Sequence, residues 1–265
     1  MRDAATDVGP PRSTRSGTQG RPPEEMEDLV SLSLKRVARV AELRRYPVKS
    51  MAAEPLQSVA LGWHGFEGDR RWAFVRPALE RSDFPWLTIR ERAEMGDYRP
   101  RFADPCRPDD SRTIVQTPGG EDFDVVDPRL AAAFGDGVRV IKQNRGVFDI
   151  APVSLISAAT VRAISDAADV APDVRRFRPN ILVDVADEAY AEDAWVGHVL
   201  RIGDAAIRLD QRDKRCVMVD VDPETSLRRP GVLRTIARRR SSCLGVYGTT
   251  VTPGRLRVGD SVYLC

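Results

Sequence analysis

A single cysteine, Cys216, separates a charged run from an apolar run in the segment RLDQRDKRCVMVDVDPET (208–225). Lys214 and Arg215 directly precede it, and neighbouring cations favour the thiolate form of a cysteine. A thiolate can act as a nucleophile or as a ligand for a soft metal. The alternative is a structural thiol that packs as a small hydrophobic residue in an edge strand. The residues of this segment leave both interpretations open.

The pattern around the cysteine predicts a strand, because apolar residues alternate through KRCVMVDVD (214–222). With a period of two, the valines at 217, 219 and 221 share one face, which we expect to face the core. Cys216 and Asp220 then share the opposite face. The thiol is expected beside the cations and away from the valines.

Basic residues occur at the ends of several predicted strands and loops, where ligand groups collect at the mouth of a barrel. If they converge, their guanidinium and ammonium groups suit a phosphate or another multiply charged anion. Taken one at a time, each is more commonly a solvated surface residue. They are Lys49, Arg70, Arg71, Arg90, Arg175, Arg176 and Arg178.

Other common site chemistries find little support in the sequence. The chain has only two histidines, His64 and His198, both at turns or strand entrances, which disfavours a Ser-His-Asp triad or a multi-histidine metal site. The four cysteines form no C-x-x-C pair, so their spacing fits neither a zinc site nor an iron–sulfur cluster. The glycines of GWHGFEG (62–68) lack the strand–helix context of a nucleotide-binding loop.

The charge balance limits the partners that we expect. The chain has 265 residues with 41 basic and 39 acidic side chains, a net charge of +2, which argues against nucleic-acid or membrane-surface binding. No apolar run is long enough to span a membrane. Residues 1–33 are rich in Arg, Pro, Gly and Ser and have no signal-type apolar stretch, so we expect a disordered tail on a cytoplasmic protein.

Short alternating segments separated by glycine and proline turns predict a mostly β (α+β) fold with few helices. Strand signals fill residues 34–126, and two-residue glycine turns at 203–204 and 259–260 predict two hairpins. Helices are expected within 127–137, from Ser157 or Ala158 to about 168, and within 230–242, the last with Val232, Leu233 and Ile236 facing inward.

Six segments together resemble the MOSC-domain proteins, named for the C-terminal domain of molybdenum-cofactor sulfurase. Within that family the likeness is greatest to the mitochondrial amidoxime-reducing component and its bacterial relatives. Beyond the tail expected at 1–33 from composition, the resemblance implies an N-terminal β-barrel domain at 34–137 and a β-barrel MOSC domain at 138–265. The segments are RYPVKS (45–50), GFEGDRRWAF (65–74), RFRPNILVD (176–184), AYAEDAWVGHVLRIGD (189–204), RCVMVDVDPET (215–225) and GVYGTTVTPGRLRVGDSVYL (245–264).

The resemblance implies a molybdenum cofactor, a pterin whose dithiolene sulfurs hold the metal and whose phosphate needs cations. Cys216 occupies the position of the family's molybdenum-ligating cysteine. The resemblance also implies a small-molecule substrate that is reduced with electrons from another source. Here we expect the electrons to come from a separate electron-donor protein of ferredoxin or flavoprotein type. The implied cofactor-binding positions are Lys49, Arg70, Arg71, Arg90, Arg178, Ser154 and Asn180.

The chain departs from the family motif R-C-x-x-T-T-V-D-P-x-T-G at three positions. Val219 and Asp220 replace its two threonines, and Ser226 replaces its final glycine. We expect Asp220 to act in acid–base chemistry at the metal or to weaken cofactor binding. The leading hypothesis is a molybdenum-cofactor oxidoreductase acting on N-hydroxylated substrates. The alternatives are a sulfur carrier with a persulfide on Cys216, and a non-catalytic binder of the cofactor.

Overall fold

The computed structural model describes residues 34–186 and 188–265, so the expectation for residues 1–33 lies outside the described part. The described residues are mostly β, as predicted. The strands are β1 (Lys35–Arg45), β2 (Glu54–Leu56), β3 (Ser58–Gly62), β4 (Gly65–Phe66), β5 (Trp72–Val75), β6 (Arg99–Phe102), β7 (Thr113–Gln116), β8 (Asp122–Asp124), β9 (Arg139–Lys142), β10 (Val153–Ser157), β11 (Ile181–Asp184), β12 (Val199–Ile202), β13 (Ala205–Lys214), β14 (Cys243–Thr252), β15 (Gly254–Arg257) and β16 (Ser261–Leu264).

The helices are short and few. The α-helices among the described residues are α2 (Pro128–Ala132), α3 (Ala158–Ala167) and α4 (Val232–Arg240). The 3-10 helices are η1 (Pro77–Leu79), η2 (Ala93–Asp97), η3 (Val174–Arg176), η4 (Ala191–Trp195) and η5 (Val217–Asp220). No helix in the described ranges has the length and apolar character needed to cross a membrane.

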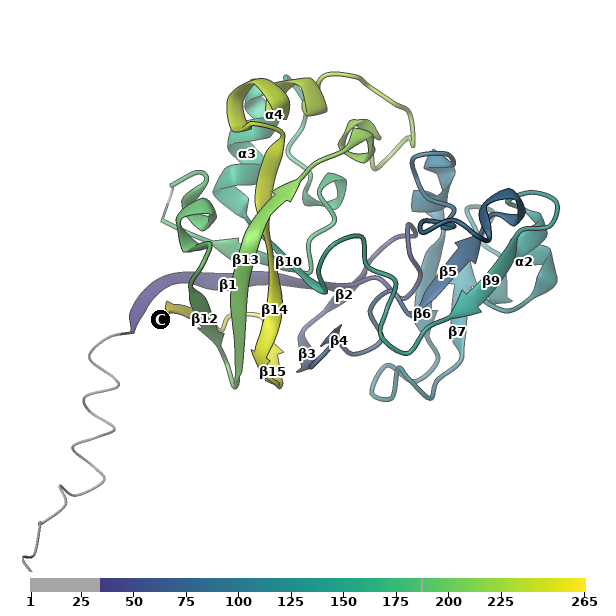
Figure 1. The fold of residues 1–265 in the computed structure, drawn as a ribbon, viewed down its shortest axis with the longest axis horizontal. Coiled ribbons are helices and arrows are strands. Elements are labelled where there is room, and N and C mark those ends of the chain that lie inside the picture. Colours follow the sequence, from purple (N-terminus) through teal and green to yellow (C-terminus); the bar gives the residue numbers. More distant parts are fainter. Residues whose placement is uncertain (1–33, 187) are drawn as a thin grey trace, which may run out of the picture. The chain divides into compact units, whose positions relative to one another are not determined.

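A closed barrel of seven strands forms the larger core (Figure 1). The strands follow the order β11-β10-β14-β13-β12-β16-β1, and β1 pairs again with β11 to close the ring. Every neighbouring pair is antiparallel except β10 with β11. In β1, Ala38 and Val40 face inward with a period of two, and a bulge between Val40 and Glu42 brings Leu43 inward next.

The remaining strands form three small sheets. These sheets are β15-β3-β4, β5-β9 and β6-β7-β8. A second hydrophobic core lies among β5, β7, η2 and α2, with Phe74 and Phe134 in edge-to-face contact at a centroid distance of 5.0 Å. The N-terminal part therefore supplies β1 to the barrel and β2 to the edge of the same sheet, and its other strands build the small sheets, one of them together with β15.

One predicted hairpin is confirmed and the other is wrong. Ile202 pairs with Ala205 across the two-residue turn between β12 and β13, as predicted. At 259–260 the chain instead passes between sheets, because β15 pairs with β3 and β16 pairs with β1 and β12. Gly259 donates to the carbonyl of Val40 and Val40 donates to the carbonyl of Asp260, so this turn is tied to β1.

The predicted helices are confirmed. Ser157 caps α3 by accepting a hydrogen bond from the Thr160 amide. In α4, Val232 and Ile236 are buried, and the two helices share one apolar cluster on the outside of the barrel (Figure 1). This packing also fixes the segment that carries Cys216, because Val219 belongs to the same cluster.

The predicted strand through Cys216 is wrong. Cys216 is extended, but the chain then turns into η5. Buried Arg176 donates to the carbonyls of Val219 (3.2 Å) and Val221 (2.8 Å), which removes these groups from any strand ladder. Both valines are buried, as predicted, but in two different apolar clusters.

Candidate functional site

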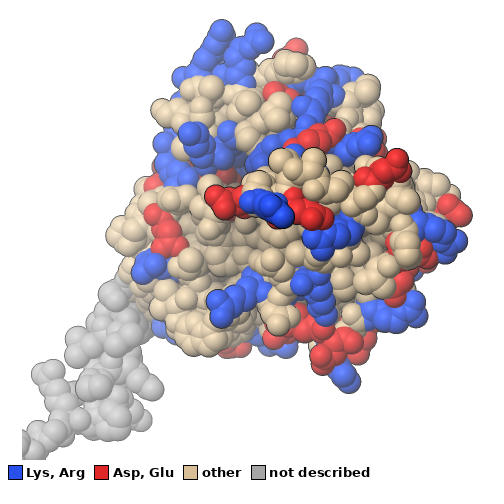
Figure 2. Space-filling model, turned by 45° about the vertical axis from the view of Figure 1, so that its right-hand side comes forward, with Lys and Arg blue, Asp and Glu red and all other residues tan. Residues whose placement is uncertain are grey.

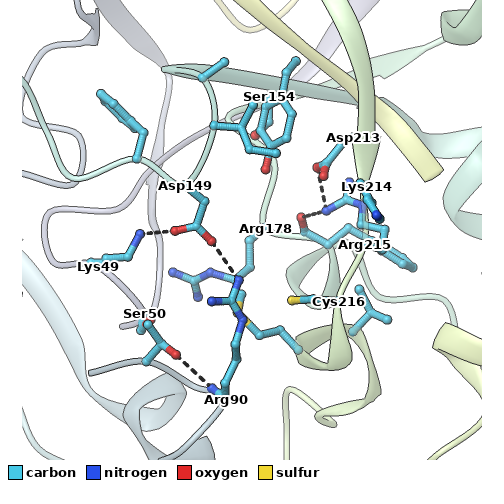
Figure 3. A pocket seen from close by; sticks show the side chains of 18 of the residues that line it. Lys49, Ser50, Arg90, Asp149, Ser154, Arg178, Asp213, Lys214, Arg215 and Cys216 are labelled. Atoms are coloured by element: carbon cyan, nitrogen blue, oxygen red, sulfur yellow. Dashed lines mark hydrogen bonds and ion pairs between the residues drawn. The ribbon is translucent and has the colours of Figure 1, made fainter. Parts of the chain in front are cut away.

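A cavity of about 280 Å³ lies where the loops of both sequence halves meet, and Cys216 lines it (Figure 3). Its walls come from the loop after β1, the segment before η2, the loop before β10, the turn before β11 and the end of β13. Seven basic residues line it, against the two acidic residues Asp149 and Asp213. The basic residues are Lys49, Arg70, Arg90, Arg176, Arg178, Lys214 and Arg215.

The concentration of cations is local to the cavity. On the face shown in Figure 2, acidic and basic side chains are interspersed over the surface. A concave site with one sign of charge focuses its field on a ligand inside it. The cavity therefore favours an anionic ligand, although the chain as a whole carries a net charge of only +2.

The Cys216 sulfur is partly exposed and points into the cavity toward the side chains of Arg90 and Arg178 (Figure 3). Burial lowers the pKa of the Arg90 guanidinium, and the neighbouring sulfur of Cys216 more than offsets this, so the pKa lies above its ordinary value. Cysteine sulfur is a ligand that soft metals prefer, and this one faces the cavity beside a cation.

Asp149 bridges two of the cations. Its carboxylate forms an ion pair with the Lys49 ammonium through one oxygen and with Arg90 Nη2 at 3.1 Å through the other. Burial raises the pKa of Asp149, but Lys49 and Arg90 more than offset this and lower it. Burial also lowers the pKa of Lys49, and the ion pair only partly opposes that shift. Lys49 is fixed further by donating to the carbonyl of Val147 at 3.0 Å.

Arg70 and Arg178 both stack on the buried ring of Tyr46, with distances from guanidinium carbon to ring centre of 4.6 and 4.4 Å. Arg70 also forms an ion pair with Asp69. Both arginines have a positive φ, of 50° and 52°, which turns the chain sharply at each position. The two cations are thereby held at one wall of the cavity.

Two cations keep hydrogen-bonding capacity for a ligand. Arg178 donates to the Met51 carbonyl at 2.8 Å and forms no ion pair with any described residue. Burial and the charge of Arg70 lower the pKa of Arg178 to about 10. Lys214 is exposed at the rim and likewise has no ion pair in the described ranges. An anionic group entering the cavity would find these donors available.

The two polar residues expected near the pterin lie together. Ser154 lines the cavity, and its hydroxyl donates to Asn180 Oδ1 at 3.3 Å. Asn180 is buried behind it and donates to Asp69 Oδ2 at 3.2 Å. Asn180 therefore orients Ser154 and the Asp69–Arg70 pair and is not part of the lining.

Two further predicted site residues, besides Asn180, lie outside the lining. Arg71 forms an ion pair with Asp109 at 2.9 Å. The Asp220 carboxylate is buried and accepts hydrogen bonds from the amides of Gly231 (3.3 Å) and Leu233 (2.9 Å), so it caps the start of α4. Asp220 does not share a face with Cys216, because the predicted strand is replaced by η5.

The other departures from the family motif have a structural setting. Val219 is buried and lines the cavity. Ser226 adopts a φ of 54°, the left-handed region that glycine enters most easily, and its hydroxyl donates to Asp97 Oδ1 at 2.8 Å.

Sequence reasoning missed three cavity residues, namely Asp149, Asp213 and Tyr247. Asp149 stands between the apolar residues Phe148 and Ile150, just before a predicted strand. A carboxylate is unusual at such a position and is a signal that could have been used. Asp213 lies within the charged run before Cys216, and only its burial distinguishes it from its neighbours. Tyr247 gives no signal in its own segment.

The donor set restricts the kind of metal ligand. No group of three or more His, Cys, Asp or Glu side chains positioned to hold a metal ion occurs in the described part of the chain. A metal that binds here must bring most of its own ligands. One thiol, several cations and polar Ser154 fit a molybdenum cofactor, which supplies two sulfur ligands and carries a phosphate.

Comparison with known proteins assigns two domains. Residues 37–145 match the MOSC N-terminal beta barrel domain, and residues 142–263 match the MOSC domain. The chain is 31% identical over 129 residues to human mitochondrial amidoxime-reducing component 1, covering 44% of this chain and 37% of that protein. It is 26% identical over 269 residues to molybdenum cofactor sulfurase of Drosophila mojavensis, covering 84% of this chain and 34% of that protein.

A solved structure is also similar. The YuaD protein from Bacillus subtilis is 13% identical, with a TM-score of 0.47 and coverage of 87% of this chain and 97% of that one. The curated relatives are much longer than the matched segments. The two domain matches run through both halves of the described fold, including every residue of the cavity, and the chain is a MOSC-domain protein.

Proposed function

We propose that this protein binds a molybdenum cofactor, with Cys216 as the protein ligand to the metal, and that it reduces N-hydroxylated compounds. A separate electron-donor protein supplies the electrons. The observation that supports this most is the single thiol beside Arg90 in a cavity lined by seven basic residues. The similarity to amidoxime-reducing proteins supports the reaction class.

The residues of the cavity divide into those that bind and those that position. Arg178 and Lys214 have donors available for the phosphate or pterin, and Ser154 offers a hydroxyl from the floor. Tyr46 and Asn180 hold Arg70, Arg178 and Ser154 in place. The cofactor, when bound, supplies the two-electron chemistry that breaks the N–O bond.

Molybdenum content is the first test. The protein is purified from a host that makes molybdenum cofactor, and we expect close to one molybdenum and one phosphorylated pterin per chain. The matched Cys216→Ala protein should contain far less molybdenum. Wild-type protein without molybdenum under these conditions would contradict the proposal. Loaded protein is then assayed with a model amidoxime and reduced viologen, and we expect the corresponding amidine.

A second candidate is a sulfur carrier in which Cys216 holds a persulfide. It is supported by the similarity to molybdenum cofactor sulfurase, which extends over 84% of this chain. The cations that favour a thiolate would equally favour a persulfide anion. Protein that lacks molybdenum but yields cyanide-releasable sulfur from Cys216 would favour this candidate. Protein that holds molybdenum but reduces no N-hydroxylated compound would favour a non-catalytic binder.

A further inference from the structure

Asp213 is a buried acid in the wall of the cavity. Its side chain is 2% exposed, and it lies at the end of β13, three residues before Cys216. Its Oδ2 atom is buried and makes no well-oriented hydrogen bond with any described residue. A buried carboxylate oxygen whose contact is an ion pair without hydrogen-bond geometry is costly, so this oxygen is expected to bind a ligand or a proton.

The cation nearest to Asp213 is already engaged elsewhere. Arg215 Nη1 lies 2.9 Å from Asp213 Oδ2, but the Arg215 guanidinium also donates to the carbonyls of Leu244 and Phe177, each at 2.8 Å. These backbone bonds fix Arg215 in the wall. The ion pair with Arg215 offsets the burial of Asp213 only in part, whereas Asp149 pairs with two cations, Lys49 and Arg90.

We infer that Asp213, with Tyr247 beside it, donates a proton to the substrate during cleavage of the N–O bond. This inference rests on the proposed reductase function. Tyr247 lines the cavity from β14, where it pairs with Gln211 of β13, so Asp213 and Tyr247 reach the cavity from neighbouring strands.

The reaction balances with one N–O bond broken. Two electrons from the donor protein and two protons convert the N–OH group to N–H and release the oxygen as water. Asp213 gives one of these protons to the departing oxygen and becomes a carboxylate. It regains a proton from water through the open cavity, whose rim includes exposed Lys214.

The surroundings of Asp213 favour its protonated form. Burial raises its pKa to about 6, and Arg215 and the hydroxyl of Tyr247 oppose this only in part. Of the other charged groups that face it, Asp149 raises the pKa and Arg70 lowers it. Burial and Asp213 also raise the pKa of Tyr247, so the phenol keeps its proton. Asp213 is therefore a proton donor below about pH 6 and loses that capacity above it.

The test compares four variants with the wild type. Asp213→Asn removes the proton donor with little change in shape, Asp213→Glu keeps a carboxyl group, and Tyr247→Phe removes the phenol. Asp122→Asn is the control, because Asp122 is exposed and pairs with Arg101 outside the cavity. Each protein is measured for molybdenum content, for the pH dependence of amidoxime reduction with reduced viologen, and, without metal, for carboxyl titration by carbon-13 NMR.

We expect wild-type turnover to fall as the pH rises through about 6. Asp213→Asn should keep its molybdenum, and its turnover should be about 100-fold lower or more. It should also lack the fall in turnover around pH 6, as expected when a general acid is missing. Asp213→Glu should restore part of the rate and of this pH dependence. In metal-free wild type, one carboxyl should titrate near pH 6 and be absent from the Asn protein.

Several outcomes would overturn the inference. Normal turnover and an unchanged pH profile in Asp213→Asn would do so while leaving the reductase proposal intact. Asp213→Asn could also lose molybdenum while the protein that remains loaded keeps the wild-type pH profile of turnover. That result would show that Asp213 only holds Arg215 in place. If the Asn protein does not fold, the Glu protein decides, because turnover there that does not follow the titration of its carboxyl group would exclude this side chain as the proton donor. Loaded wild type that reduces no amidoxime would refute the reductase proposal itself.

Discussion

The guanidinium carbon of Arg178 lies 4.4 Å from the centre of the Tyr46 ring, inside the protein. Arg70 contacts the same ring at 4.6 Å. Two neighbouring cations repel each other, and an aromatic ring in contact with both offsets part of that repulsion. Tyr46 is thus a support for the positive wall of the cavity, and its hydroxyl is anchored by donating to the Pro179 carbonyl at 3.0 Å.

Replacing Tyr46 should separate the role of its ring from that of its hydroxyl. Tyr46→Phe keeps the ring and should lower the free energy of unfolding by about 0.5–1.5 kcal/mol, with molybdenum content unchanged. Tyr46→Leu loses both cation–π contacts, worth about 0.5–2 kcal/mol each, and should lower stability and molybdenum content together. Urea denaturation and elemental analysis provide the two readouts. Equal molybdenum content in the Leu and Phe proteins would show that the ring does not organise the site.

Replacing Arg178 should affect the ligand more than the fold. Arg178→Ala removes a charge-assisted hydrogen bond to the anion, worth about 1.5–3 kcal/mol, or about one to two decades in affinity. Molybdenum content should fall while the melting temperature of the metal-free protein changes little. Arg71→Ala is the matched comparison, since Arg71 pairs with Asp109 outside the lining and should leave molybdenum content normal. Reduced melting with normal content in Arg178→Ala would remove Arg178 from the site.

Cys216 should be the cysteine on which activity depends. Cys216→Ala should abolish amidoxime reduction and remove most of the molybdenum. Cys106→Ala and Cys265→Ala should be nearly silent, because both thiols are exposed and neither lines the cavity. Full activity in the Cys216 protein would show that its sulfur is not a ligand.

Asp220 should act on stability, because its carboxylate caps α4. Asp220→Ala leaves two amides at the start of the helix without an acceptor and should cost about 0.5–2 kcal/mol. Asp220→Asn retains one oxygen and should cost less. The check is urea denaturation beside turnover per molybdenum. Unchanged stability with lost turnover would support the sequence-based hypothesis that Asp220 is catalytic.

The stability of the protein should depend on pH through Asp213. Its pKa is raised from 3.8 to about 6 in the folded state, so the folded protein holds this proton more tightly than the unfolded chain. The contribution of Asp213 to stability is present below about pH 4 and is lost as the pH rises to about 6. The loss is up to about 3 kcal/mol, since one pKa unit corresponds to about 1.4 kcal/mol.

Asp213→Asn does not titrate, so its free energy of unfolding relative to wild type should rise between pH 4 and pH 7. Urea denaturation at a series of pH values measures this difference. Asp122→Asn serves as the control, because Asp122 is exposed at its pairing with Arg101. A constant difference between Asp213→Asn and wild type across this range would mean that Asp213 is ionised throughout.

Local patterns in the sequence determined much of the fold. Alternation and glycine turns identified the strands and the hairpin at 203–204, and Ser157 marked the start of α3. These features depend on neighbours within a few residues, which the sequence shows directly. The residue types showed a thiol among cations but left a structural and a functional role open, and the family resemblance favoured the functional one.

Only the tertiary structure decided which side chains share the cavity. Arg70 and Arg71 are adjacent and alike in sequence, yet one stacks on Tyr46 and the other pairs with Asp109. The strand expected at Cys216 became a 3-10 turn because Arg176, about 40 residues earlier, binds the carbonyls of that segment. Asp213 belongs to a charged run in the sequence, and its burial depends on β14 and the loops packed around it. Contacts between distant segments set these outcomes, and no local pattern of residues encodes them.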